Sequence, residues 1–307
     1  MESKYDICGF GSCLIDKIFY IKEDGTYNGT PDLLANGGKC PNQLVAATRA
    51  GAKTALLCKV ADDEIGKKLV NNLIQNNIDV SHVEYITGLE NDNNILQIDE
   101  DSDNHIVRRV NELSDSYTVN FIRNNTDVLM GSKIVLTHLK PPKEVLIELI
   151  DFCHKNNKFL ILTPSHPFKI NIEEKENLEL IDKISMIVSN ETECKQVFNT
   201  ENIESCVEKY PNKLIVTLGE KGLMYHNGTE VIKLEAIKVS NVVDTIGAGD
   251  TFVGNLACYL AHGKSLKEAV NRGRYASSLK IQKKGAQTGM PYKEELDEFI
   301  LKSEDLK

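Results

Sequence analysis

The stretch Asp244-Thr-Ile-Gly-Ala-Gly-Asp250-Thr-Phe252 joins three small residues to an aspartate and then to an apolar helical pattern. Apolar residues recur at helical spacing from Phe252 onward, and Gly263 stands where such a helix would end. Backbone N–H groups at a helix N-terminus carry partial positive charge, and small residues let an anion approach them closely. The stretch therefore fits a phosphate or oxyanion cradle, with Asp250 placed to take a proton from a hydroxyl. It fits a glycine-rich turn capped by aspartate equally well, because short motifs also occur by chance.

Outward from this stretch, short apolar runs alternate with helical patterns along most of the chain. The expected strands are 7–11, 54–60, 133–137, 159–163, 187–189 and 214–217. The expected helices are 41–49, 62–75, 144–154, 178–184, 191–198, 250–261, 265–282 and 293–301. Strands that alternate with helices predict an α/β domain whose parallel sheet is covered by helices on both faces.

Two segments break this alternation. Residues 12–36 carry turn signals and short strand-like pieces, and residues 83–111 alternate like strands. We expect them to pair as a small β-sheet lid made from two insertions, 12–36 and 83–111. The main domain then consists of residues 1–11, 37–82 and 112–307.

Composition limits the class of protein. The chain has 307 residues and a net charge of −9, which argues against nonspecific binding to nucleic acid or anionic membranes. No apolar run is long enough for a transmembrane helix, and the acidic start does not read as a secretory signal. The eight cysteines form no Cys-x-x-Cys pair, and the seven histidines do not cluster at metal-ligand spacing. These features predict a cytoplasmic protein with reduced, mostly buried thiols.

Two other phosphate-binding motifs are weaker. Gly263-Lys264-Ser265 resembles the end of a Walker loop, but Cys258 holds the required earlier glycine position, so we reject it. Gly9-Phe-Gly11 follows a predicted strand as a dinucleotide fingerprint does, but Leu14 holds the third glycine position. Gly9 and Gly11 are better interpreted as turn residues.

A second motif, Asn36-Gly-Gly-Lys-Cys-Pro-Asn-Gln43, leads into the predicted helix 41–49. Its glycines, lysine and amides could bind the hydroxyls of a polyol. On its own it reads as a loop–helix junction in which Asn42 caps the first turn. Asp16 lies just after the first predicted strand, where a lone aspartate is usually a solvated turn residue.

The positions of these motifs in the predicted fold suggest that they form one site. In an open parallel sheet, ligands bind outside the carboxyl ends of the strands. Asp16, residues 38–42, Lys140 and Asn190 all follow predicted strands or begin helices. Their order resembles that of the ribokinase-like (pfkB) family of carbohydrate kinases. The stretch 244–250 resembles the family's C-terminal signature, and residues 37–42 with 46–52 and 60–66 resemble its N-terminal signature. Segments 190–193, 217–222 and 284–291 also fall in family order, so the resemblance spans residues 5–303.

The resemblance implies a ribokinase-like three-layer α/β/α fold with a mainly parallel central sheet and a small β-sheet lid. Gly-Gly-Lys-x-x-Asn and Lys-Gly-Ala-Gln resemble the ribokinase branch more than the fructokinase, adenosine kinase or phosphofructokinase branches. The implied activity is ATP-dependent phosphorylation of D-ribose to ribose 5-phosphate, in a homodimer formed through the lid. Alternatives are the same chemistry on another sugar, a nucleoside or an acidic sugar, and a catalytically silent sugar- or nucleotide-binding regulator. A dinucleotide-dependent oxidoreductase would rest on Gly9-x-Gly11 alone.

The resemblance also implies residue roles. Asp250 is the expected base, and Gly247, Ala248 and Gly249 form the expected anion hole. The expected sugar-binding residues are Leu14, Asp16, Gly38, Lys39, Asn42, Lys140 and Asp250. The expected ATP-binding residues are Asn190, Thr217, Leu218, Gly219, Glu220, Lys221, Gly222, Gly249 and Arg274. Mg²⁺ would be organised by Asn190 and Glu193 through water, and K⁺ would be held at Asp244, Ile246, Lys280, Lys283, Gly285 and Gly289.

The chain departs from the ribokinase pattern at four places. Leu14 replaces a polar sugar-contacting residue, Cys40-Pro41 replaces two small residues, and Gly289 replaces a small hydroxyl residue near the cation site. Lys140 stands where a ribokinase has a glutamate that faces the sugar. Its ammonium could reach solvent on its long stem, which leaves the substrate unchanged. Alternatively it could favour an acidic substrate, with help from Arg108 and Arg109 on a predicted lid strand.

Overall fold

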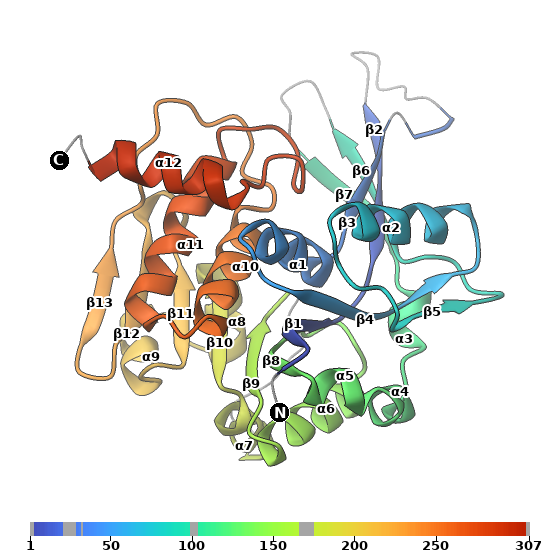
Figure 1. The fold of residues 1–307 in the computed structure, drawn as a ribbon, viewed down its shortest axis with the longest axis horizontal. Coiled ribbons are helices and arrows are strands. Elements are labelled where there is room, and N and C mark those ends of the chain that lie inside the picture. The colour runs from blue at the N-terminus through green and yellow to red at the C-terminus, as the bar shows by residue number, and fades with distance from the viewer. Residues whose placement is uncertain (1–2, 21–28, 32, 99–103, 166–174, 305–307) are drawn as a thin grey trace.

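Nine strands form the central sheet, in the order β13-β12-β11-β10-β9-β8-β1-β4-β5 (Figure 1). The structure is a computed structural model that describes residues 3–20, 29–31, 33–98, 104–165 and 175–304. The strands are β1 (Tyr5–Phe10), β4 (Thr54–Ala61), β5 (Val83–Ile86), β8 (Ser132–His138), β9 (Phe159–Thr163), β10 (Met186–Asn190), β11 (Leu214–Thr217), β12 (Leu223–His226) and β13 (Val231–Leu234). Neighbours from β5 to β11 pair in parallel, and β12 and β13 add an antiparallel edge.

Helices cover both faces of this sheet because successive strand residues are buried on opposite sides. Ile7 and Leu56 pack in one apolar core with α1, α2, α10 and α11, whereas Cys8 and Leu57 pack in a second core with α4 to α9. The helices are α1 (Lys39–Arg49), α2 (Glu64–Gln75), α3 (Glu112–Asp115), α4 (Val119–Asn124), α5 (Thr126–Met130), α6 (Lys143–Lys155), α7 (Lys175–Lys183), α8 (Glu191–Phe198), α9 (Ile203–Lys209), α10 (Ala248–Ala261), α11 (Leu266–Lys280) and α12 (Lys293–Glu304). The predicted three-layer α/β/α fold is confirmed.

The strand order reverses direction at β1. The chain passes from β1 to β4 and β5 on one side, and later from β8 outward on the other. In open α/β sheets this reversal opens a crevice at the carboxyl ends of the strands, where ligands bind. Gly9 lies inside β1 rather than in a turn, so its interpretation as a turn residue is wrong. A Cβ there would come within 2.4 Å of Cys40 Sγ, so this glycine lets α1 lie close to the sheet.

The lid is a separate four-stranded sheet that projects from the top of the molecule in Figure 1. Its order is β3-β2-β6-β7, and its strands are β2 (Leu14–Tyr20), β3 (Leu33–Gly37), β6 (Asn93–Ile98) and β7 (Asn104–Val110). The two insertions meet where β2 and β6 pair in parallel. The second insertion begins later than expected, because β5 pairs with β4 and therefore belongs to the main sheet.

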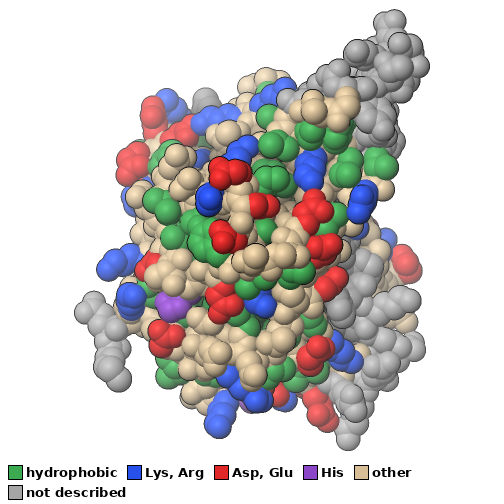
Figure 2. Space-filling view, turned by 90° about the vertical axis from the view of Figure 1, so that its right-hand side faces the viewer, with side chains coloured by type: hydrophobic (Ala, Val, Ile, Leu, Met, Phe, Trp, Pro, Cys, Tyr) green, Lys and Arg blue, Asp and Glu red, His purple; other side chains and the backbone are tan. Residues whose placement is uncertain are grey.

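Several properties of the structure agree with the expectations from composition. In the described part of the chain, no helix is long and apolar enough to cross a bilayer. All eight cysteines are free and buried, as expected from their positions in apolar runs. Figure 2 shows acidic and basic side chains interspersed over one face of the molecule, so the net negative charge is spread there rather than gathered in one patch.

Candidate functional site

The two signature segments meet at Asp250. Its Oδ2 accepts a hydrogen bond from Asn42 Nδ2 (3.1 Å), and its Oδ1 accepts one from Gln43 Nε2 (3.2 Å). Gln43 also donates to Thr163 Oγ1 (3.1 Å) at the end of β9, and Asn42 Oδ1 accepts from Gln287 Nε2 (2.9 Å). Asn42 is therefore not the cap of α1: Gly38 holds the N-cap position, without any side-chain cap.

Close packing of two helices makes this contact possible. Gly254 of α10 faces α1, where a Cβ would lie 2.3 Å from the carbonyl oxygen of Gln43 and 2.6 Å from the Cβ of Ala46. Helices approach this closely only where one of them lacks a side chain. The first turn of α1 is thereby held beside the first turn of α10.

The start of α10 has the geometry of an anion cradle. Gly247 is the N-cap residue and adopts a left-handed conformation (φ 79°) that glycine tolerates without strain. A Cβ at Gly249 would meet no atom within 4 Å, so the approach to the first-turn N–H groups is open. The first N–H groups of a helix have no intrahelical acceptor and can bind an anion. The N–H of Ala248 already donates to the carbonyl oxygen of Thr245 (3.1 Å), so the cradle depends on the N–H groups that follow it, beginning with Gly249.

Electrostatics at Asp250 suit a group that takes up a proton. Burial raises the pKa of the Asp250 carboxyl above its ordinary value. The Lys39 ammonium and the two amide hydrogen bonds lower it in turn, so they oppose the rise. His138 is the nearby alternative base, at the end of β8. Burial, with the Lys140 and Lys39 charges, lowers the pKa of His138 to about 3, so its ring is neutral at physiological pH.

Lys39 connects the expected sugar and magnesium residues. Its Nζ donates to Glu193 Oε1 (2.8 Å) and to the carbonyl oxygen of Pro164 (3.1 Å). Glu193 and Asn190 form a capping box at the start of α8: Asn190 Oδ1 accepts from Glu193 N (2.7 Å), and Glu193 Oε2 accepts from Asn190 N (3.0 Å). Asn190 ends β10, so these oxygens lie at the carboxyl edge of the sheet. The charge of Glu193 also contributes to the raised pKa of the Asp250 carboxyl.

Asp16 lies on β2 of the lid, not in a solvated turn. Its Oδ1 accepts from Asn94 Nδ2 (2.8 Å) on the neighbouring strand β6, and burial raises the pKa of its carboxyl. Gly37 of β3 pairs with Leu14 of β2. A Cβ at Gly37 would lie 2.8 Å from the Leu14 side chain and 2.9 Å from the Asp16 carboxylate. The expected residues of the lid, Leu14 and Asp16, thus cluster around a glycine of the N-terminal signature.

Lys140 agrees neither with an ammonium that reaches solvent nor with a free charge that favours an acidic substrate. Its Nζ pairs with Asp92 Oδ2 (2.8 Å), a fully buried carboxylate, and the lysine side chain is 19% exposed. Ser114 donates from its backbone N–H to Asp92 Oδ1 (3.2 Å), and its hydroxyl also contacts Asp92. The ammonium is therefore neither carried out to solvent nor left as an unpaired charge for an acidic ligand. Arg108 and Arg109 are exposed on β7.

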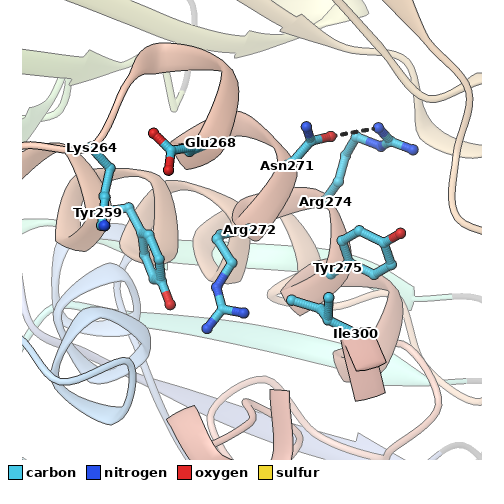
Figure 3. A pocket seen from close by; sticks show the side chains of 8 residues that line it. All are labelled: Tyr259, Lys264, Glu268, Asn271, Arg272, Arg274, Tyr275 and Ile300. Atoms are coloured by element: carbon cyan, nitrogen blue, oxygen red, sulfur yellow. Dashed lines mark hydrogen bonds between the residues drawn. The ribbon is translucent and has the colours of Figure 1, made fainter. Parts of the chain in front are cut away.

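Besides Asn190 and Gly249, the expected nucleotide residues fall in two places. Thr217 ends β11, and a 3₁₀ turn (Gly219–Lys221) and Gly222 follow it at the carboxyl edge of the sheet. Arg274 lies on α11, where its Nη1 donates to Asn271 Oδ1 (2.8 Å). It lines a groove between α10, α11 and α12 (Figure 3), whose residues are Tyr259, Lys264, Glu268, Asn271, Arg272, Arg274, Tyr275 and Ile300. No hydrogen bond or ion pair in the described ranges joins Arg274 to Thr217–Gly222.

The expected potassium residues gather around a lysine. Lys280 Nζ donates to the carbonyl oxygen of Asp244 (2.7 Å), and Gly289 lies against the Lys280 stem. Ile246 has an exposed side chain, and Lys283 pairs with Glu295. An ammonium group thus already binds the backbone of Asp244, one of the residues expected to hold K⁺.

Sequence reasoning missed four residues of this region: Gln43, Asp92, Asn94 and Gln287. Gln43 was visible as a second amide beside Asn42. Asp92 and Asn94 stand in Asn91-Asp-Asn-Asn94, a polar run at the start of an otherwise alternating strand, and that run was the available signal. Gln287 stands in the Lys-Gly-Ala-Gln motif (284–287), but nothing there indicated its contact with Asn42, which spans most of the chain.

Comparisons with known proteins agree with this geometry. The family model described as pfkB family carbohydrate kinase matches residues 4–293. The chain is 33% identical to a ribokinase of Bacillus subtilis over 301 residues, which cover 96% of this chain and 99% of that protein. It is 26% identical to a deoxyribokinase of Salmonella typhi over 310 residues, with 96% and 98% coverage.

The fold also matches a solved structure. The ribokinase of Arabidopsis thaliana, complexed with ribose and ATP, superimposes with a TM-score of 0.84 at 23% identity, covering 98% of this chain and 99% of the other. The sheet, the lid and the order of the two signature segments along the chain all accord with the match of the family model. The chain belongs to the pfkB family of carbohydrate kinases.

Proposed function

We propose that this carbohydrate kinase transfers the γ-phosphoryl group of ATP to the 5-hydroxyl of D-ribose. The observation that carries the proposal is the position of Asp250, which is held by Asn42 and Gln43 at the open start of α10. The likeness to the ribokinase of Bacillus subtilis supports ribose as the acceptor.

The proposed reaction follows from this arrangement. Lys39, Asn42 and Asp16 bind hydroxyls of the sugar, and Asp250 orients the primary hydroxyl. The hydroxyl oxygen forms a bond to the γ-phosphorus as the bond to the bridging oxygen breaks, ADP leaves, and Asp250 takes the proton. The N–H groups of Gly249 and its neighbours stabilise charge on the transferred group, because their dipoles are fixed before the reaction. The lid excludes water, which limits wasteful hydrolysis of ATP.

Magnesium fits the residues beside the cradle. Mg²⁺ is usually bound through one or two carboxylates, with water and substrate phosphates completing its shell. In the described part of the chain no cluster of three or more acidic, His or Cys residues could bind it directly. Glu193 and Asn190 are the oxygen ligands that would hold it, through water, against the ATP phosphates. When bound, the ion would neutralise phosphate charge.

A second candidate acceptor is 2-deoxy-D-ribose, which Leu14 favours. Leu14 offers no hydrogen bond to a sugar hydroxyl, and it lies beside Asp16 through Gly37. An apolar site discriminates only weakly, by roughly 100-fold at most, against a substrate that carries an additional hydroxyl. A site that hydrogen-bonds a hydroxyl discriminates far more strongly against a substrate that lacks this hydroxyl. We expect Leu14→Asn to raise kcat/KM for ribose relative to deoxyribose.

The Lys140–Asp92 pair argues against an acidic sugar, because the buried carboxylate already compensates the ammonium. A preference for an acidic compound that Lys140→Glu abolishes would reverse this view.

The decisive experiment is a coupled assay of ADP release over ribose, deoxyribose, fructose, nucleosides and sugar acids. The highest kcat/KM on ribose supports the proposal, and a higher value on deoxyribose supports the second candidate. A preference for any other acceptor contradicts both. If no compound is phosphorylated while ATP and ribose still bind in calorimetry, the chain is a silent regulator.

A further inference from the structure

The ammonium group of Lys280 is fully buried at the end of α11. The residue is 0% exposed, and its Nζ donates to the carbonyl oxygen of Asp244 (2.7 Å). The Asp244 carboxylate lies 3.9 Å away at its Oδ1. Lysine is almost never fully buried unless it is paired, because removing a cation from water is costly. A buried lysine at this place therefore needs a compensating role.

The carbonyl that it binds begins the segment leading to the anion cradle. Asp244 Oδ1 accepts from Ile246 N (2.8 Å), and Asp244 Oδ2 accepts from Gly285 N (2.7 Å). From α11, Ser277 Oγ donates to the carbonyl oxygen of Ala248 (2.8 Å). Residues 244–248 are thus braced against α11 and the loop after it, and Lys280 supplies the only full positive charge among these contacts in the described chain.

The loop also makes room for the lysine stem. A Cβ at Gly289 would lie 3.2 Å from both Cε and the carbonyl oxygen of Lys280, and 3.1 Å from the carbonyl oxygen of Gly285. The backbone of Gly289 is not left-handed, so its conformation does not demand glycine. The space taken by the Lys280 stem and by the two carbonyl oxygens is the reason for a glycine at this position.

We propose that the Lys280 ammonium is a tethered cation that stands in for the monovalent ion which the family resemblance implies at this loop. The inference rests on the proposed kinase function, and it makes Lys280 a positioning residue for the anion cradle. An ammonium group matches K⁺ in charge and closely in size, and backbone carbonyl oxygens bind either. A K⁺ ion on the same carbonyl would lie near the buried ammonium, and two like charges that water does not separate repel each other strongly. The site therefore does not fit a separate potassium ion.

The test compares the K⁺ dependence of the wild type with that of Lys280→Ala. Sugar-dependent ADP release is measured in tetramethylammonium buffer, with KCl added stepwise or replaced by NH₄Cl. We expect the wild-type kcat to change less than about twofold. We expect Lys280→Ala to lose about 100-fold in kcat without K⁺, since a small displacement of a catalytic element has effects of that order, with little change in KM for the sugar. Added K⁺ or NH₄⁺ should then restore kcat with saturation.

Two further variants separate charge from packing. Lys280→Met keeps the length of the stem without its charge and fills the space, so it should be slow and not rescued by K⁺. Lys267→Ala removes an exposed lysine near the start of the same helix and should behave as the wild type. Wild-type activation by K⁺ of more than tenfold, or a K⁺-free Lys280→Ala as fast as the wild type, overturns the inference. So does a slow Lys280→Ala that no monovalent cation rescues.

A thermal-shift measurement keeps the inference testable apart from the proposed function. K⁺ should stabilise Lys280→Ala more than choline does, and should leave the wild type unaffected. If no sugar is phosphorylated, the proposed function fails, while this K⁺-specific shift in the variant alone still supports the tethered cation. Equal shifts in both proteins contradict it.

Discussion

Asp250 is the residue on which the proposed chemistry depends most directly. Both of its oxygens accept hydrogen bonds from amide donors, so Asp250→Asn keeps the size of the side chain, loses one of these hydrogen bonds and removes the proton acceptor. We expect kcat to fall on the order of 1000-fold while KM for the sugar changes little, as for loss of a general base. The measurement is steady-state ADP release, with sugar binding followed by calorimetry. Glu64→Gln, which alters an exposed carboxylate in the first turn of α2, is the matched control. A kcat near the wild-type value in Asp250→Asn would remove this residue from the base role.

The acid limb of the pH profile tests the same residue through its surroundings. Asp250 must be deprotonated to accept a proton, so kcat falls as the pH drops through its pKa. Burial raises that pKa above the ordinary value of 3.8, and the Lys39 ammonium opposes the rise. Lys39→Met removes the opposing charge, so its acid limb should lie at higher pH than that of the wild type. Profiles of kcat between about pH 4.5 and 8 measure the shift, with the exposed Lys267→Met as the control. An unchanged or lower limb in Lys39→Met contradicts the prediction.

At the scale of elements, the site depends on how closely α1 and α10 pack. A Cβ at residue 254 would lie 2.3 Å from the backbone oxygen of Gln43, so backbone atoms must move apart in Gly254→Ala. We expect a loss of about 2 kcal/mol in the free energy of unfolding, as for overpacking, although alanine favours helices. We also expect kcat to fall at least tenfold, because Gln43 and Asn42 move away from Asp250.

Urea denaturation and ADP release measure the two effects. Ala261→Gly, a change in the opposite direction near the end of the same helix, should cost about 1 kcal/mol in stability and leave kcat unchanged. If Gly254→Ala is as stable and as active as the wild type, α1 and α10 are not held by this contact.

The elements that the sequence predicted well are those with buried, periodic residues. Strands β1, β4, β8 to β11 and the long helices carry runs or stripes of apolar residues, so their places were predictable. Helices α3 to α5 and strands β12 and β13 span four to six residues, which give too little periodicity. The β5 strand was assigned to the lid because alternation shows that a strand exists but not which sheet it joins.

The candidate site was predictable where a motif and its neighbours in sequence define it. The small residues before Asp250 and the glycines before Lys39 mark helix starts, and the structure places both at the same edge of the sheet. Contacts between distant segments were not predictable: Lys140 with Asp92, and Gln287 with Asn42, depend on loops whose path only the fold determines. The role of Lys280 was not predictable for the same reason, because α10 and most of α11 separate Lys280 from Asp244 in the sequence.

At the scale of the whole molecule, we propose that two copies pair through the lid. Strands β3 and β7 form the two edges of the lid sheet, and edge strands offer unpaired backbone groups to another chain. Leu33 on β3 is 46% exposed and Val107 on β7 is 57% exposed. Figure 2 shows hydrophobic side chains among charged ones toward the top of the molecule, the end from which the lid projects. Pairing of these edges would cover apolar side chains that one chain leaves exposed.

Light scattering after size exclusion measures this directly. The wild type should elute at about twice the 34.3 kDa mass of one chain, and Val107→Lys should shift it toward the monomer, because charge on an edge strand opposes pairing. Val242→Lys is the matched control, since Val242 is also 57% exposed but lies on the segment before the cradle and outside the lid. It should leave the mass unchanged. A wild type that is monomeric at micromolar concentration contradicts the proposed dimer. A dimer that Val242→Lys disrupts and Val107→Lys does not would place the contact between copies away from the lid. In a lid-mediated dimer, Val107→Lys should also raise KM for the sugar, because the partner no longer steadies the strands that carry Asp16 and Asn94.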